Sequence, residues 1–139
     1  MFVYERTVRF HEVDAAGLLF FPWFFSYAHE AMEAWCGALD GGYARLILQR
    51  RVGLPAVALA SEFVAPLRYG DAARVELGVS RLGNRSLTLE YGFRRRSDGE
   101  SCATISHTVV CTDLDALAST DMPSDLRELA AQHLRTSSG

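Results

Sequence analysis

Pro22-Trp-Phe-Phe-Ser-Tyr-Ala-His-Glu-Ala-Met-Glu-Ala-Trp-Cys-Gly-Ala38 is the stretch of this sequence that decides the fold. Pro22 suits the first turn of a helix, where a missing N–H costs nothing, and the glycines at positions 37, 41 and 42 mark its end. The apolar residues recur at helical spacing, at Phe24, Tyr27, Ala28, Ala31, Ala34, Trp35 and Ala38. Because this helix is apolar around much of its surface, we expect it to be buried on most sides.

The rest of the chain has the alternating pattern of antiparallel strands. We expect strands over residues 3–10, 56–65, 74–80, 87–94 and 103–111, with turns at Gly83-Asn84 and Ser97-Asp98-Gly99. We also expect a short second helix over 42–51, a loop over 115–122 and a terminal helix over 123–134. One long apolar helix followed by an antiparallel meander predicts an α+β fold, in which a curved antiparallel sheet wraps around one long central helix.

Length and charge limit the class of protein. The chain has 139 residues, which predicts one domain over residues 1–135 and a disordered tail at 136–139. A disordered chain is excluded, because 49% of the residues are hydrophobic and 22% are charged. The net charge is −3, and all 14 basic residues are arginine. A dedicated binder of duplex nucleic acid would normally be basic, so we expect no nucleic-acid partner.

The three cysteines, Cys36, Cys102 and Cys111, are far apart and form no C-x-x-C pair. Such a set indicates neither a disulfide scaffold nor a zinc site, and it fits a reducing compartment. The residues after Met1 do not have the pattern of a signal peptide, and no uncharged apolar stretch approaches the ~18 residues of a membrane span. We therefore expect a cytoplasmic protein with no membrane span.

The polar bend before the helix is the first candidate for chemistry. It places Asp14 a few residues upstream of the helix start, next to small residues and Gly17. A helix N-terminus offers unpaired N–H groups and partial positive charge, which polarise a carbonyl or hold an oxyanion. A carboxylate beside them suits a nucleophile or a general base. The same residues also suit an Asx-turn without catalytic function, and the local pattern by itself favours that turn.

Several motifs resemble one family. Phe10-His-Glu-Val-Asp-Ala-Ala-Gly-Leu-Leu-Phe-Phe-Pro-Trp-Phe24 resembles the opening motif of the hotdog-fold acyl-CoA thioesterases, in the branch of 4-hydroxybenzoyl-CoA thioesterase and the Tol-Pal-associated thioesterases. Ala65-Pro-Leu-Arg-Tyr-Gly-Asp71, Gly83-Asn-Arg-Ser86 and Met122-Pro-Ser-Asp-Leu-Arg127 resemble later turns of the same family, in the same order. The resemblance implies a hotdog fold, a homodimer or homotetramer with active sites between subunits, and hydrolysis of acyl-CoA without metal or cofactor.

The resemblance also assigns residues. Asp14 matches the catalytic carboxylate, and the backbone N–H of Phe21 matches the donor to the thioester carbonyl, since Pro22 has no N–H to give. Arg85 and Ser86 match positions that reach toward CoA phosphates, which suits the forked guanidinium of arginine. The full expected set of substrate-binding residues is Gly17, Pro22, Phe24, His29, Arg85 and Ser86.

The sequence departs from the family at a few positions. Glu12 stands where the family often has Asp, and His29 and Met32 stand where Tol-Pal-type relatives often have Glu and Arg. These changes bear on the choice of acyl group, for which the resemblance suggests an aromatic acyl-CoA of the 4-hydroxybenzoyl type. His29 suits either a pocket residue or a helix histidine satisfied by neighbours, and His107 suits a hydrogen-bonded core residue better than a base.

Two other functions compete with thioester hydrolysis. An enoyl-thioester hydratase of the same fold would pair a histidine with a carboxylate in a His-x-x-x-x-Gly-type signature, which is not visible here. A non-catalytic acyl-CoA-binding protein would have no need of Asp14. Both alternatives therefore rank below the thioesterase.

Overall fold

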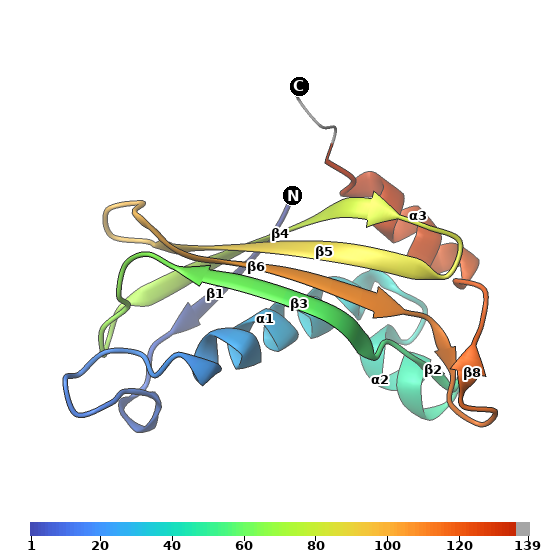
Figure 1. The fold of residues 1–139 in the computed structure, drawn as a ribbon, viewed down its shortest axis with the longest axis horizontal. Helices are drawn as coiled ribbons and strands as arrows, with labels where there is room; N and C mark the ends of the chain where they lie inside the picture. Colours follow the sequence, from blue (N-terminus) through green and yellow to red (C-terminus); the bar gives the residue numbers. More distant parts are fainter. Residues whose placement is uncertain (136–139) are drawn as a thin grey trace.

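A five-stranded antiparallel sheet curves around the long helix α1 in the computed structural model, which describes residues 1–135 (Figure 1). The strands lie in the order β1 (Phe2–Thr7), β4 (Ala72–Leu82), β5 (Ser86–Arg95), β6 (Ser101–Val110) and β3 (Ala56–Phe63). The helix α1 (Pro22–Trp35) is extended by the 3-10 turn η2 (Cys36–Ala38). This arrangement confirms the predicted α+β fold, a curved sheet around one long central helix. The expected tail, residues 136–139, lies outside the described residues.

Smaller elements close the end of the sheet that receives the C-terminus of α1. They are α2 (Gly42–Leu48), a small sheet of β2 (Val52–Gly53), β7 (Thr112–Asp113) and β8 (Ala118–Ser119), and the terminal helix α3 (Ser124–Gln132). The indole N–H of Trp35 in α1 donates to Nδ1 of His133 at 3.1 Å, which joins α1 to the segment after α3. The terminal helix and the short second helix were both predicted, with ends that differ from the observed ones by at most three residues. Among residues 1–135, no helix is long and apolar enough to cross a membrane, and the cytoplasmic location stays a prediction.

Two sequence-based boundaries were wrong for physical reasons. The first strand was expected to reach residue 10, but it stops at Thr7, and Phe10–Glu12 forms a 3-10 turn, η1. The turn forms because the Glu12 carboxylate accepts the N–H of Arg9 and the Glu12 N–H donates back to the Arg9 carbonyl. The loop expected over 115–122 contains β8, which pairs with β7.

The core lies between α1 and the inner face of the sheet. Tyr27, Ala31 and Trp35 are fully buried on the helix and pack on buried residues of the three central strands, among them Val75, Leu77, Leu89 and Phe93. The sequence pattern predicted both faces, because the helix repeats near 3.6 residues and the strands repeat every two.

The strand β3 forms a free edge of the sheet. It pairs with β6 on one side, and all eight of its residues are exposed in the isolated chain. Val57 is 60% exposed and Leu59 54% exposed, so the edge is apolar as well as unpaired. A long apolar edge strand is a template for pairing with another chain, which natural proteins normally cover.

We predict that two protomers pair through β3. The mass in solution at micromolar concentration should then be at least twice that of the 15.4 kDa chain, measured by light scattering. Val57→Asp places a charge on the paired edge and should shift the mass toward one chain. Leu117→Asp is the control, because Leu117 is 79% exposed but lies in the turn between β7 and β8. A fully active monomer in the wild-type protein would contradict the pairing.

Candidate active site

The turn that leads into α1 is held by the Asp14 side chain. Oδ1 of Asp14 accepts the N–H groups of Ala16 at 2.9 Å and Leu18 at 3.2 Å. The Asp14 N–H donates to the Leu18 carbonyl at 2.8 Å, and Gly17 has a φ of +77°, a left-handed conformation that suits glycine. The Asx-turn favoured by the local pattern is therefore present. Its two donors bind one carboxylate oxygen, and within residues 1–135 the other oxygen has no hydrogen-bond partner.

The N-terminus of α1 leaves one backbone donor free. The N–H of Trp23 donates to the Phe20 carbonyl at 2.9 Å, and that of Phe24 donates to the Phe21 carbonyl at 3.1 Å. Pro22 has no N–H. Throughout the described part of the chain, the Phe21 N–H has no acceptor, and it stands where the partial positive charge of the helix is concentrated. It is therefore available to an oxygen atom of a bound molecule.

Asp14 and Phe21 line the same hollow, which we call the Asp14 hollow. It has a volume of about 480 Å³ and lies between the start of α1 and the segment that follows β3. Phe24 and Phe63 form part of its apolar wall, with ring centroids 5.2 Å apart. A free carboxylate oxygen and a free N–H thus meet at one apolar concavity, and this combination suits a carbonyl substrate.

A buried carboxylate, that of Glu12, holds the Asp14 turn and the start of α1 in place. Glu12 is fully buried, and its Oε1 accepts the Tyr27 hydroxyl of α1 at 2.5 Å and the Arg9 N–H at 2.8 Å. The guanidinium of Arg6, on β1, pairs with both Glu12 oxygens. The Glu12 backbone carbonyl accepts the Phe20 N–H at 2.9 Å. One residue therefore links β1, the turn that carries Asp14, and the start of α1.

The electrostatics of Glu12 follow from these partners. Burial alone would raise the pKa of the Glu12 carboxyl, but the hydrogen bonds from Tyr27, the Arg9 N–H and Arg6, together with the Arg6 charge, hold it below its ordinary value. Burial and the neighbouring Glu12 carboxylate raise the pKa of Tyr27, so its hydroxyl remains a donor. The group is thus an ionised, fully bonded buried carboxylate.

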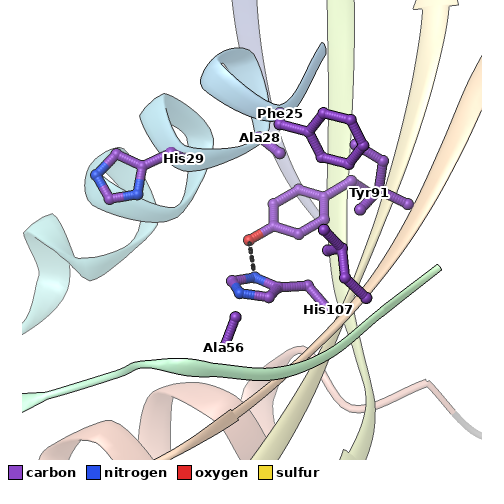
Figure 2. Close-up of a pocket in the computed structure, with 8 residues that line it drawn as sticks. Phe25, Ala28, His29, Ala56, Tyr91 and His107 are labelled. Carbon is purple, nitrogen blue, oxygen red and sulfur yellow. Dashed lines mark hydrogen bonds between the residues drawn. The ribbon is translucent and has the colours of Figure 1, made fainter. Parts of the chain in front are cut away.

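A second hollow, the His107 hollow, lies further along α1 and has a volume of about 190 Å³ (Figure 2). Its lining comes from α1, β3, β5 and β6: Phe25, Ala28, His29, Ala56, Leu59, Tyr91, Ile105 and His107. Both hollows are lined by α1 on one side and by β3 or the segment that follows it on the other, and we call this region beside β3 the crevice. Phe63 separates them, because its ring contacts those of Phe24 and Phe25 at 5.2 and 6.2 Å between centroids.

The expected substrate-binding residues fall into three places. Gly17 shapes the Asx-turn, Pro22 begins α1, and Phe24 forms a wall of the Asp14 hollow. His29 lies at the edge of the His107 hollow, half-exposed, with Nε2 2.8 Å from Glu33 and its ring edge-on to Tyr43. His29 therefore lines a hollow and is also satisfied by a neighbour, and its contact with the acyl group stays a prediction.

Arg85 and Ser86 lie at the opposite end of the sheet from Asp14. The Cys111 N–H donates to the Arg85 carbonyl, whereas the segment after β3 that lines the Asp14 hollow is bonded to Cys102. Roughly 30 Å of extended chain separates these two cysteines. The Arg85 guanidinium is bound to Asp121 at 3.0 Å and to Ser119 at 3.0 Å. Within one protomer, the structure does not bring Arg85 or Ser86 to the Asp14 hollow.

Sequence reasoning missed two groups of polar residues. Glu12 was noted only as a departure from Asp, yet it is the buried centre of the site, and its partner Tyr27 was assigned only to the apolar face of the helix. The available signal was an acidic side chain in the turn with an arginine six residues before it on a strand. The second missed contact is that of Tyr91 with His107: a hydrogen bond of His107 was expected, but its partner lies on a different strand and has no sequence signature.

Comparisons with known proteins show the family of this chain. A family model described as the thioesterase-like superfamily matches residues 8–129. A protein named 1,4-dihydroxy-2-naphthoyl-CoA hydrolase from Synechocystis sp. is 26% identical to this chain, over 88% of this chain and 88% of its own length. A protein of the same name from Gloeothece citriformis is 32% identical, over 80% of this chain and 78% of its own length. The solved structure of a gentisyl-coenzyme A thioesterase is 28% identical, covers 90% of this chain and 98% of that chain, and superposes with a TM-score of 0.79.

The chain therefore belongs to the thioesterase-like superfamily. The predicted hotdog fold and the predicted enzyme class, a thioesterase, are confirmed. The narrower assignment to the branch of 4-hydroxybenzoyl-CoA thioesterase and the Tol-Pal-associated thioesterases is not, since the named relatives do not single out that branch.

Asp14→Asn separates the chemistry of Asp14 from its structural role. Asparagine keeps an oxygen that accepts the Ala16 and Leu18 N–H groups, so the Asx-turn should persist. The negative charge and the basicity are lost, and we predict a fall in kcat of about 10²- to 10⁴-fold or more. Substrate binding and thermal unfolding should change little. Near-normal turnover by a folded Asp14→Asn protein would contradict a catalytic role for this carboxylate.

Glu12 should make stability depend on pH. Because the folded-state pKa is depressed, its contribution is fully present above the ordinary carboxyl pKa and is lost as the pH falls through the depressed value. Glu12→Gln removes the buried charge opposite the partly buried Arg6 and should lower the free energy of unfolding at pH 7 by about 2–4 kcal/mol.

The difference in unfolding free energy between Glu12→Gln and the wild type should then become smaller as the pH is lowered from 7 toward 2.5, measured by urea titration at each pH. Glu128→Gln, at an exposed position of α3, is the control and should have little effect at any pH. Glu12→Gln as stable as the wild-type protein at pH 7, or a difference in unfolding free energy between them that does not change with pH, would argue against this role of Glu12.

Proposed function

We propose that this protein hydrolyses an aromatic acyl-CoA to a free carboxylic acid and CoA. The observation that carries the proposal is that the Asp14 carboxylate and the free Phe21 N–H line the same apolar hollow. Hydrolysis of a thioester uses two such groups: a donor at the carbonyl oxygen, and a carboxylate that attacks the carbonyl carbon or activates a water molecule.

The reaction starts with the thioester oxygen accepting the Phe21 N–H. If Asp14 is the nucleophile, its oxygen adds to the carbonyl carbon, the C–S bond breaks, CoA leaves as the thiolate, and water hydrolyses the resulting anhydride. If Asp14 is a general base, it takes a proton from water as the water oxygen adds to the same carbon, and the thiolate leaves and is protonated. The negative charge that develops on the carbonyl oxygen faces the Phe21 N–H in both routes.

The shape of the crevice favours a flat, apolar acyl group. Beyond the Asp14 hollow, the crevice is bordered by aromatic rings and leads to the His107 hollow, and a cavity of about 150 Å³ is already large enough for benzene. Three similar proteins carry names that describe hydrolysis of an aromatic acyl-CoA, 1,4-dihydroxy-2-naphthoyl-CoA or gentisyl-CoA. These points support an aromatic acyl group.

A second protomer completes the site in this proposal. The crevice runs beside β3, whose free edge is exposed along its whole length. If two β3 strands pair antiparallel about a two-fold axis, the Ala56 end of one strand lies beside the Phe63 end of the other. Arg85 and Ser86 lie at the Ala56 end of their sheet. The pairing therefore brings the Ala56 end of the second protomer's sheet close to the Asp14 hollow of the first. The CoA nucleotide of a substrate bound in that hollow would extend toward this end.

Hydrolysis of a panel of acyl-CoA thioesters tests the proposal directly. We expect kcat/KM to be at least tenfold higher for benzoyl- and naphthoyl-type substrates than for acetyl- or hexanoyl-CoA, as measured by release of the CoA thiol. Hydration of crotonyl-CoA without thiol release would instead indicate the enoyl-thioester hydratase. Tight binding of acyl-CoA without either reaction would indicate a binding protein.

Arg85→Ala tests the CoA contact. We predict a roughly 3- to 30-fold rise in KM for acyl-CoA with kcat nearly unchanged, because binding far from the reacting carbonyl acts equally on the ground and transition states. An acyl-pantetheine lacks the nucleotide and should be unaffected. Arg45→Ala is the matched control, since the Arg45–Asp40 and Arg85–Asp121 pairs have almost the same exposure. Equal changes for both substrates would mean that Arg85 only joins the turn before β5 to β8.

A further inference from the structure

The His107 hollow contains a pair of polar side chains on an otherwise apolar floor. Tyr91 on β5 and His107 on β6 project from the sheet into the space beside α1, and the Tyr91 oxygen lies 3.4 Å from Nδ1 of His107 (Figure 2). Apolar residues surround the pair: Phe25, Ala28, Leu59 and Ile105. The catalytic groups Asp14 and Phe21 lie in the other hollow, so hydrolysis leaves this pair without an assigned role.

Both side chains are uncharged in this position. Burial lowers the pKa of His107, and the nearby His29 lowers it further, so the imidazole is neutral near pH 7. Burial also raises the pKa of Tyr91, which keeps its hydroxyl protonated. Nδ1 of His107 faces the Tyr91 hydroxyl, and within residues 1–135 the other ring nitrogen, Nε2, has no hydrogen-bond partner. A neutral imidazole therefore offers one unused polar atom inside an apolar hollow.

We propose that His107, held in place by Tyr91, selects aromatic acyl groups that carry a ring hydroxyl. This inference rests on the proposed function, which supplies the aromatic ring. A hydroxyl both donates and accepts a hydrogen bond, so it matches Nε2 in either tautomer of the imidazole. A ring carboxylate is disfavoured, because it would bring a charge into a largely apolar hollow, one of whose lining residues, His29, is paired with the carboxylate of Glu33.

The distance along α1 fits one aromatic ring. Phe21 offers the N–H to the thioester oxygen, and Ala28, which lines the His107 hollow, lies seven residues later. At 1.5 Å per residue, this is about 10 Å along the helix axis. An aryl carbonyl group with a hydrogen bond of about 2.8 Å at each end spans a distance of this order. Phe63, which separates the two hollows, then lies beside the ring.

His29 is the rival for this role, since it lines the same hollow. Its Nε2 already has a partner in Glu33, and its side chain is half-exposed at the entrance, whereas His107 is at the floor. A site built to bind a hydroxyl rejects the analogue without it, because the bound analogue covers the polar atom and leaves it unpaired. Selectivity should therefore follow His107 rather than His29.

The test compares matched substrate pairs that differ in ring hydroxyls, 4-hydroxybenzoyl- against benzoyl-CoA and 1,4-dihydroxy-2-naphthoyl- against 2-naphthoyl-CoA. We expect the wild-type protein to prefer the hydroxylated member of at least one pair by roughly 10- to 100-fold in kcat/KM. His107→Leu should reduce that ratio to within about threefold of unity, mainly through loss of activity on the hydroxylated substrate. Tyr91→Phe should reduce it partly, and His29→Leu should leave it unchanged.

A ratio isolates selectivity from folding, because a purely structural defect lowers both rates together. His107→Gln restores an amide donor and acceptor, and partial recovery of the ratio is expected if His107→Leu folds poorly. A wild-type ratio near one for both pairs, a ratio that His107→Leu leaves unchanged, or a ratio that follows His29 would overturn the assignment.

If the proposed function is wrong, the wild-type protein will hydrolyse no aromatic acyl-CoA, and this result differs from those that overturn the role of His107. Calorimetric binding of 4-hydroxyphenacyl-CoA and phenacyl-CoA, which are thioethers that cannot be hydrolysed, then still tests the hydroxyl contact. The hydroxylated ligand should bind roughly tenfold more tightly to the wild-type protein and equally to His107→Leu. Equal binding of both ligands to the wild-type protein would overturn the contact independently of catalysis.

Discussion

The buried Glu12 carboxylate is the interaction on which the rest of this site depends. It accepts hydrogen bonds from Tyr27 of α1 and from the Arg9 N–H, and it pairs with Arg6 of β1. Its backbone carbonyl accepts the Phe20 N–H, one residue before the free donor at Phe21. An unpaired carboxylate in this position would be costly, so the partners keep the strand, the turn and the helix in one fixed relation. The Asp14 carboxylate and the Phe21 N–H take their positions from that relation.

The second constraint is the free edge of β3. The same strand borders the crevice that holds both hollows and leaves its outer side unpaired, so the binding crevice and the edge of the sheet are one region of the molecule. Pairing with another protomer would cover the apolar edge and supply a wall to the crevice together. In this account, assembly and substrate binding use the same surface, which explains why Arg85 lies so far from Asp14 within one chain.

The sequence was informative where a periodic pattern or a short motif sets the structure. The apolar repeat after Pro22 predicted α1, the alternation in residues 74–94 predicted the central strands, and the turn before Pro22 indicated Asp14. Contacts between distant residues were not accessible in this way. No residue next to Glu12 in the sequence indicates that the Tyr27 hydroxyl binds it. Tyr91 contacts His107 because β5 and β6 pair in a register that puts Tyr91 opposite Ile105, two residues before His107. Strand β1 was expected to be longer for the same reason, since the Glu12 side chain ends it.

The claim at the centre of this account is that the Phe21 N–H binds the carbonyl oxygen of the substrate. The most direct measurement is the backbone amide NMR spectrum of the protein as 4-hydroxyphenacyl-CoA is added, because this ligand places a ketone oxygen where the thioester oxygen would lie. We expect the Phe21 amide proton to move downfield as the site fills, and the amides of Trp23 and Phe24, already bonded within the chain, to move much less. A Phe21 amide signal that stays in place at saturation would contradict the account.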